Sequence, residues 1–165
     1  MSTDAGRPFD DLELWAWHGM LRTHAEVIRR LDEQMARRHD LAVTEFDVLI
    51  TLDNAPDREL RMSELAGRVM LSASGLTRLV GRLERAGLVG RRQALDDGRS
   101  FLAGLTEAGA QRLAEARPTH NAVIRELFLG KLSSADQAAL GRAWSVLDAA
   151  TSEDRQHSPS NDASA

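Results

Sequence analysis

Apolar residues recur at heptad spacing along the N-terminal part of the chain. One row comprises Leu14, Leu21, Ile28 and Met35, and a second row lies three positions later at Trp17, His24 and Leu31. This spacing predicts one long helix over residues 11–38 with a single apolar seam. Such a seam must be covered by another helix, from the same chain or from a partner.

Two short helices are predicted after the long one. Thr44 followed by Asp47 resembles a capping box at the start of an apolar segment that reaches Leu52. Residues 53–57 contain asparagine and proline and predict a loop. Ser63 is then suited to cap the second short helix.

The segment from Ser72 to Gly87 divides into two contrasting faces. Ser72 is a favourable N-cap and Gly87 a favourable residue just past a helix end, so the segment predicts a helix. One face is apolar and consists of Leu76, Leu79, Val80 and Leu83. The opposite face carries small, hydroxylated and cationic residues, namely Ser74, Thr77, Arg78, Gly81, Arg82 and Arg85.

A basic β-hairpin is predicted next. Residues 89–95 and 100–105 are short extended candidates, and the Asp-Gly pair between them favours a tight turn. Beyond the hairpin, Thr106 can cap a helix from Glu107, which Pro118 is expected to kink or break. Ser133 with Asp136 marks the start of a last helix, and the polar residues 151–165 predict a disordered tail.

Composition and charge narrow the possible functions. No apolar run approaches the roughly 18–20 residues of a membrane span, and nothing marks the acidic N-terminus for export, so we expect a cytoplasmic protein without membrane contact. The absence of cysteine excludes disulfides, thiol redox sensing and cysteine-ligated zinc. The net charge is −4, yet seven arginines and three acidic residues between Arg68 and Arg99 give that region +4. A basic centre between acidic ends is typical of a DNA-binding module.

A helix, a turn, a second helix and a basic hairpin together suit double-stranded DNA. An α-helix fits the major groove, and a β-ribbon beside it can follow the backbone or enter the minor groove. Short side chains at Ser74, Thr77 and Gly81 let the helix approach base edges, while Arg78 and Arg82 can reach guanines or phosphates. The N–H groups at the helix start favour a phosphate, to which Ser72 can contribute.

Five segments occur in a recognisable order and spacing: 62–66 (MSELA), 72–80 (SASGLTRLV), 83–89 (LERAGLV), 97–100 (DGRS) and 105–109 (LTEAG). With them the chain resembles the MarR family of transcriptional regulators over about residues 11–150. The resemblance implies a homodimer whose first and last two helices interlock and whose two winged modules read a pseudo-palindromic site. It also implies that Arg99 at the wing tip enters the minor groove, with Asp97 orienting the wing arginines.

We therefore expect a mostly α (α+β) fold with a winged helix-turn-helix over residues 43–106. Residues 11–42 and 107–150 form the expected dimerisation region, after a flexible N-terminus at 1–10. The expected DNA-binding residues are Ser72, Ser74, Thr77, Arg78, Arg82, Arg91, Arg92, Asp97 and Arg99. The expected function is a ligand-responsive repressor, and the alternative is a protein-interaction module whose basic face meets an acidic partner. Ala103 and Gly104 are smaller than the usual wing residues, which leaves the packing of this hairpin open.

The other chemistry-bearing residues indicate neither an enzyme nor a metal or cofactor site. His18 and His24 lie roughly 240° apart around a helix and cannot chelate from one face, and no nucleophile-elbow sequence is present. The resemblance instead implies a phenolic or other small aromatic effector, which we place at Trp15, Trp17, His24 and His120. The alternative roles are core or interface packing for the tryptophans and a hydrogen-bonded core position for the histidines.

Overall fold

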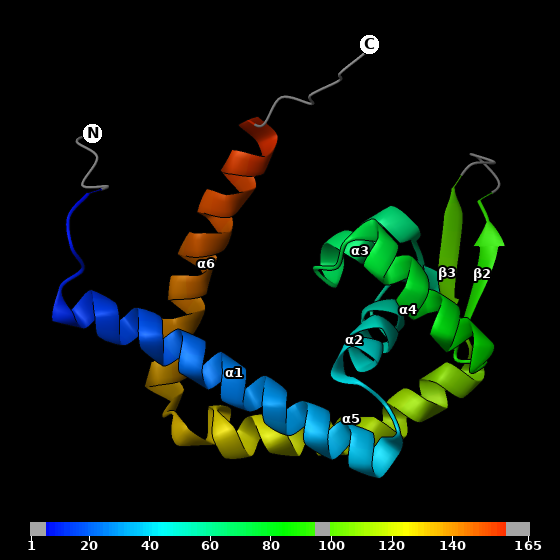
Figure 1. Cartoon of the computed structure of the whole chain (residues 1–165), viewed down its shortest axis with the longest axis horizontal. Coiled ribbons are helices and arrows are strands. Elements are labelled where there is room, and N and C mark those ends of the chain that lie inside the picture. Colours follow the sequence, from blue (N-terminus) through cyan, green and yellow to red (C-terminus); the bar gives the residue numbers. More distant parts are fainter. Residues whose placement is uncertain (1–5, 95–99, 158–165) are drawn as a thin grey trace. The chain divides into compact units, whose positions relative to one another are not determined.

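The computed structural model describes residues 6–94 and 100–157, in a chain that divides into two compact units, Met1–Val123 and Ile124–Ala165. The elements, labelled in Figure 1, are in order α1 (Asp11–His39), α2 (Val43–Asp53), the 3₁₀ turn η1 (Pro56–Arg58), β1 (Glu59–Arg61), α3 (Met62–Arg68), α4 (Ala73–Arg85), β2 (Val89–Gln93), β3 (Phe101–Leu105), α5 (Glu107–Leu127), the 3₁₀ turn η2 (Leu129–Lys131) and α6 (Ser134–His157). The predicted fold class, mostly helical with a small β-wing, is confirmed.

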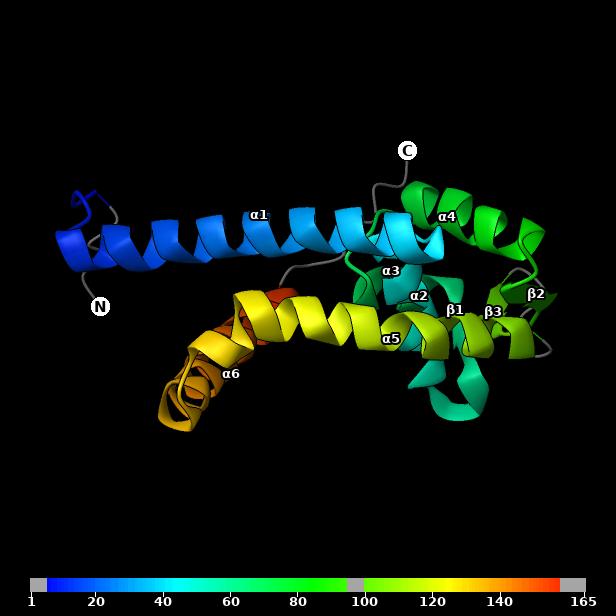
Figure 2. The same cartoon turned by 90° about the horizontal axis from the view of Figure 1, so that it is seen from below.

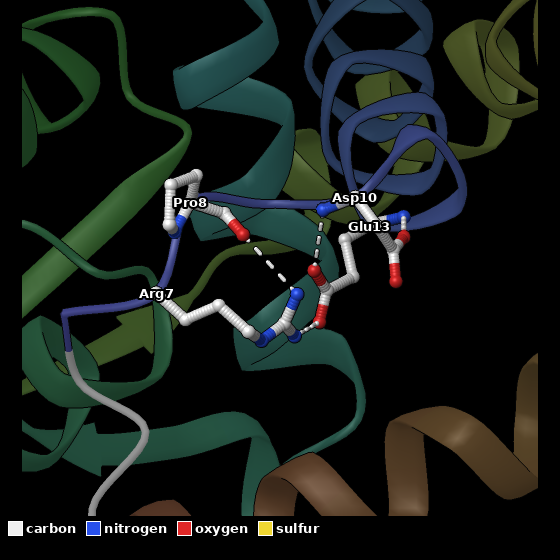
Figure 3. A network of polar contacts seen from close by, with 4 residues as sticks. All are labelled: Arg7, Pro8, Asp10 and Glu13. Atoms are coloured by element: carbon white, nitrogen blue, oxygen red, sulfur yellow. Dashed lines mark hydrogen bonds and ion pairs between the residues drawn. The ribbon is translucent and has the colours of Figure 1, made fainter.

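The long helix α1 starts at a reciprocal cap. The backbone N–H of Glu13 donates to the Asp10 carboxylate at 2.9 Å, and the N–H of Asp10 donates to the Glu13 carboxylate at 2.8 Å. The Arg7 guanidinium bonds the second oxygen of Glu13 and the carbonyl of Pro8 (Figure 3). The long helix predicted from the heptads is therefore present and has a defined N-terminus.

The starts of α2 and α3 differ from the prediction. The Glu45 carboxylate accepts the N–H of Ala42 at 3.0 Å, and the Glu64 carboxylate accepts the N–H of Arg61 at 3.3 Å. A glutamate at the third helical position can bond the cap N–H without a hydroxyl at the cap itself. Thr44, Asp47 and Ser63, which were predicted as capping residues, therefore lie inside the helices.

The wing is a three-stranded antiparallel sheet in the order β1-β3-β2. Ala103 of β3 lies opposite Leu60 of β1 on one side and Arg91 of β2 on the other. The sequence predicted β2 and β3 but missed β1, a strand of three residues that follows the loop directly. The predicted turn at 96–99 lies outside the described residues.

The core of the first unit is built around α2, which contacts α3, α4, β1 and β3. Phe46 and Leu49 of α2 are fully buried together with Leu65 of α3 and with Leu76 and Leu83 of α4. Burial of these apolar side chains fixes α3 and α4 on a common support. The polar face of α4 is consequently held outward.

Helix α5 runs unbroken through Pro118, so of the predicted kink or break the break is wrong. Pro118 removes only one backbone hydrogen bond, and its exposed position leaves the freed carbonyl accessible to water. As predicted, Thr106 caps α5, since its Oγ1 accepts the N–H of Gly109 at 3.0 Å. The C-terminal end of α1 lies against α5 (Figure 2), where Arg112 Nη1 donates to the His39 carbonyl at 2.6 Å.

The second unit contains the end of α5, η2 and α6. The N–H of Asp136 donates to Ser133 Oγ at 3.2 Å and the N–H of Ser133 donates to the Asp136 carboxylate at 3.1 Å, so the predicted start of the last helix is confirmed. α6 continues to His157, past residue 150 where we predicted its end. In the described ranges, no helix is long and apolar enough to cross a membrane.

Candidate nucleic-acid interface

Helix α4 has well-defined caps at both ends, as its sequence predicts. Ser72 Oγ accepts the N–H of Gly75 at 3.2 Å and so satisfies one donor of the first turn. Past the C-terminus, Gly87 adopts a φ of +72°, a left-handed conformation that glycine reaches without a steric penalty. The caps thereby fix which residues of the segment are helical.

The two faces of α4 have opposite environments. Leu76, Leu79, Val80 and Leu83 are buried, whereas Ser74, Thr77, Arg78 and Arg82 are exposed. A Cβ placed on Gly81 would meet no atom within 4 Å. The outer face is therefore unobstructed as well as polar, which a helix in the major groove requires.

The arginines on the outer face of α4 differ in their internal partners. Arg82 Nε lies 3.3 Å from the Glu45 carboxylate, and Arg85 Nε donates to the carbonyl of Gly81 at 3.1 Å. Within the described part of the chain, Arg78 makes neither a side-chain hydrogen bond nor an ion pair. Arg78 can therefore bond another molecule without first breaking a contact of its own.

Arg91 and Arg92 of β2 project from opposite faces of the wing, because successive strand residues alternate. Arg91 turns toward α4, where its Nε donates to the Glu84 carboxylate at 2.8 Å. Arg92 forms a two-point contact with Glu59 of β1, with Nε–Oε1 and Nη2–Oε2 distances of 3.0 and 2.5 Å. Both wing arginines thus have carboxylate partners.

Gly104 explains how Glu59 reaches Arg92 across the intervening strand. In the sheet register Gly104 lies between Glu59 and Gly90, and a Cβ on Gly104 would come within 3.1 Å of the Glu59 side chain. The small residue, whose effect the sequence left open, provides the space for this side chain. The hydrogen bond from Arg92 lowers the pKa of the Glu59 carboxyl, and the same bond raises the pKa of Arg92.

A hollow of ≈410 Å³ lies between α3, α4 and the wing. Its lining includes two guanidinium groups and three hydroxyls, from Arg61, Arg91, Ser63, Thr77 and Ser100. Arg61 Nη1 donates to Ser100 Oγ at 2.6 Å, which ties the end of β1 to the residue before β3. Guanidinium and hydroxyl groups are among the side-chain groups that bond DNA phosphates.

Two of the predicted DNA-binding residues, Asp97 and Arg99, lie outside the described residues. The described ones divide between two elements that contact each other, α4 and β2. Ser72, Ser74, Thr77, Arg78 and Arg82 belong to α4 and its cap, and Arg91 and Arg92 belong to β2. The first unit therefore brings the seven described residues of the predicted DNA-binding set together beside one sheet.

The four residues of the predicted effector site are not joined within one chain. Trp15 and Trp17 are 74% and 50% exposed, and His24 is exposed as well. His120 is half-buried and its ring stacks on Phe46, with the ring centroids 4.3 Å apart. Among the described residues, no hydrogen bond or ring contact links His120 to the other three.

Sequence reasoning missed three glutamates at this interface. Glu45, Glu59 and Glu84 each bond one arginine of the predicted DNA-binding set. Two of these pairs join residues more than thirty positions apart, so no local spacing indicates them. The Glu84–Arg91 pair crosses a single turn, and the register of β2 would have been needed to predict it.

Comparisons with known proteins agree with this geometry. The MarR family model matches residues 41–101. The HTH-type transcriptional regulator SarZ of Staphylococcus haemolyticus is 31% identical over 106 residues, which are 64% of this chain and 67% of SarZ. The MarR family regulator AbsC of Streptomyces coelicolor has a similar structure, with a TM-score of 0.82, 28% identity, and coverage of 89% of this chain and 99% of AbsC.

A second solved structure includes a nucleic acid. The MarR family regulator Sco3205 of Streptomyces coelicolor, crystallised in complex with DNA, superposes with a TM-score of 0.83 at 28% identity. The alignment covers 88% of this chain and 91% of Sco3205.

Proposed function

The chain belongs to the MarR family of DNA-binding transcriptional regulators and is not an enzyme, and from this premise we propose that it is a ligand-responsive repressor that binds a pseudo-palindromic operator as a homodimer. The observation that carries the proposal is the outer face of α4. This face is exposed and cationic, and it carries no bulky apolar side chain.

In this proposal α4 enters the major groove. Ser74 and Thr77 are short enough for the helix backbone to approach the base edges, and Arg78 reads a guanine through its unpaired guanidinium. Arg82 and the Ser72 end of the helix bond phosphates and set the register. The support of α4 by fully buried leucines makes the reading surface rigid.

The wing supplies the second set of contacts. Arg91 and Arg92 bond the backbone beside the groove that α4 occupies. Arg99 enters the minor groove at the wing tip and Asp97 orients the wing arginines; these two roles are supported by the family resemblance alone. Arg99→Ala is therefore expected to lower affinity with a milder effect on sequence choice than Arg78→Ala.

Selection of bound duplexes from a random pool tests the proposal. A homodimer reading two half-sites enriches a pseudo-palindrome whose half-sites are centred about one helical turn, roughly 10 base pairs, apart or a multiple of that. An enriched sequence without twofold symmetry would contradict the homodimeric arrangement. A pool without any enrichment would favour the alternative, a winged module that docks on an acidic protein.

We further propose that a small aromatic or phenolic effector weakens operator binding. His120 supports a position near α5, because its half-buried ring already stacks on an aromatic side chain and keeps a polar edge. Trp15, Trp17 and His24 would complete the site from exposed positions on α1. Effector and DNA then weaken each other's binding by the same factor.

Titration of phenolic acids against operator complexes tests the effector site. Wild type is compared with His24→Ala and His120→Ala, each first shown to be a folded dimer. We expect the effector concentration needed for release to rise in one or both variants. If wild type responds and both variants release DNA at the same concentration, the two histidines are structural and the site lies elsewhere.

A further inference from the structure

The ion pairs of the wing point to a role for two glutamates in DNA selection. We propose that Glu84 and Glu59 are built-in competitors of DNA phosphates: they hold Arg91 and Arg92 in the free protein and thereby lower its affinity for DNA of unrelated sequence. The inference rests on the proposed contact between the wing and DNA. It concerns residues that are not themselves expected to bind DNA.

The Glu84–Arg91 pair joins α4 to the wing. Glu84 lies near the C-terminal end of α4, and its carboxylate receives Nε and Nη2 of Arg91 at 2.8 and 2.6 Å. Arg91 also lines the hydroxyl-rich hollow between α3, α4 and the wing. A phosphate that enters this hollow must therefore draw the guanidinium away from Glu84 or share it.

The Glu59–Arg92 pair lies on the other face of the wing. Both guanidinium contacts of Arg92 go to the two carboxylate oxygens of Glu59, so the Nε–Nη2 edge of the guanidinium is occupied. Glu59 comes from β1 and reaches Arg92 only because Gly104 has no side chain between them. Each of the two strand arginines thus has its own competitor, drawn from a different element.

DNA can overcome both pairs because they are partly exposed. An exposed ion pair is weak in water and is screened by salt, whereas double-stranded DNA presents a dense row of negative charges. Binding then exchanges one anionic partner of the arginine for another and releases fewer counterions than an unpaired arginine would. The binding free energy of base contacts by Arg78 is not reduced in this way, since Arg78 has no such competitor in the described residues.

This exchange of partners is predicted to lower the affinity for DNA of unrelated sequence more than the affinity for the operator. Non-specific affinity depends almost entirely on phosphate contacts, while specific affinity also draws on base contacts. The two glutamates therefore widen the ratio between operator and non-operator affinity. Their removal should raise both affinities and reduce that ratio.

The experiment measures binding of a fluorescent duplex of mixed sequence from about 50 to about 200 mM salt. It compares wild type with Glu84→Gln, Glu59→Gln and the control Glu33→Gln, which removes an equal charge from an ion pair with Arg29 on α1. We expect each of the first two variants to bind roughly 3–10-fold more tightly at the lower salt, with a salt slope steeper by about one. The control should stay within about twofold of wild type.

A second pair of variants separates competition from a general charge effect. In an Arg92→Gln background, Glu59→Gln should no longer tighten binding, because the arginine that Glu59 holds has been removed. Persistent tightening in that background would overturn the inference for this pair.

Two other outcomes are decisive. Weaker binding or a shallower slope in Glu84→Gln and Glu59→Gln would mean that the carboxylates orient the arginines for DNA, and the inference would be wrong while the proposed function stood. If wild type fails to bind duplex at any salt concentration, the proposed function is wrong, and the inference that rests on it is wrong as well.

Discussion

Met70 occupies a backbone position that normally favours glycine. It follows α3 in the turn of the helix-turn-helix, with a φ of +54°, and the next N–H, that of Leu71, donates to the Ala66 carbonyl at 3.1 Å. This is the Schellman geometry, in which the residue past the helix end is left-handed. Its side chain is 91% exposed and so offers little packing in compensation.

Replacement of Met70 by glycine should therefore stabilise the protein. Removing the β-carbon relieves about 1–2 kcal/mol of left-handed strain, and the greater freedom of glycine in the unfolded chain offsets part of it. We expect urea unfolding to give a net gain of roughly 0.5–1 kcal/mol. The matched control is Met70→Ala, which keeps the β-carbon. An equal gain in that control would contradict the strain argument.

Gly109 is a second position where a single methyl group decides stability. A Cβ there would lie 2.1 Å from the Leu88 carbonyl oxygen and 2.7 Å from Leu105 Cδ1, so α5 could not keep its approach to the segment between α4 and the wing. We expect Gly109→Ala to cost about 2–3 kcal/mol in the free energy of unfolding. Gly67→Ala, on open surface in α3, should be neutral or gain up to about 1 kcal/mol. A neutral Gly109→Ala would show that α5 can shift freely.

At the scale of elements, the sequence predicted most helices and both long wing strands because their patterns are local. Ser72, Thr106 and Ser133 each cap the helix that was expected, since a hydroxyl cap bonds within three residues. β1 could not be predicted, because three residues carry no periodicity and its pairing depends on β3 some forty positions later. The ion pairs of the interface could not be predicted for the same reason, because they depend on how strands and helices pack in the fold.

The junction between α1, α2 and α5 contains a carboxyl in an unfavourable environment. Burial raises the pKa of Asp47, the nearby charge of Asp32 raises it further, and His120 acts in the opposite direction. A raised folded-state pKa means that the protonated acid is favoured in the fold. The associated stability is fully present below the unfolded-state pKa and is lost as the pH rises through the folded-state pKa.

Asp47→Asn should therefore stabilise the protein at neutral pH but not in acid. We expect a gain below about 1 kcal/mol at pH 7, limited because Asp47 is only half-buried and water screens its charge. The gain should shrink as the pH falls and be absent below the unfolded-state pKa of an aspartate, about 4, because Asp47 of wild type is then protonated in both states. Urea unfolding of both proteins across this range measures the difference. A loss of stability that is equal at all pH values would contradict this account.

At the scale of the whole molecule, exposed apolar side chains on α1 and α6 call for a partner surface. Leu12, Trp15 and Leu21 of α1 and Trp144, Val146 and Leu147 of α6 are all exposed. Several exposed large apolar side chains on one helix are typical of an interface, and each of the two helices carries such a set. The heptad seam predicted that α1 would need covering, but sequence alone cannot tell which helix covers it.

We expect sedimentation at micromolar concentration to show a homodimer. Leu21→Glu places a charge on the apolar seam and should shift the population toward monomer, whereas Thr23→Glu, at a position that belongs to neither heptad row, should leave it dimeric. A stable, folded wild-type monomer would contradict both the dimer and the palindromic operator.

The central claim is that the outer face of α4 reads DNA sequence, and the most direct test is the affinity of Arg78→Ala for two duplexes, the selected operator and its scrambled sequence. We predict a loss of about 1–3 kcal/mol on the operator and little change on the scrambled duplex. Arg142→Ala on α6 removes the same charge elsewhere and should leave both affinities unchanged. Equal losses on both duplexes, or an unchanged operator affinity, would contradict the claim.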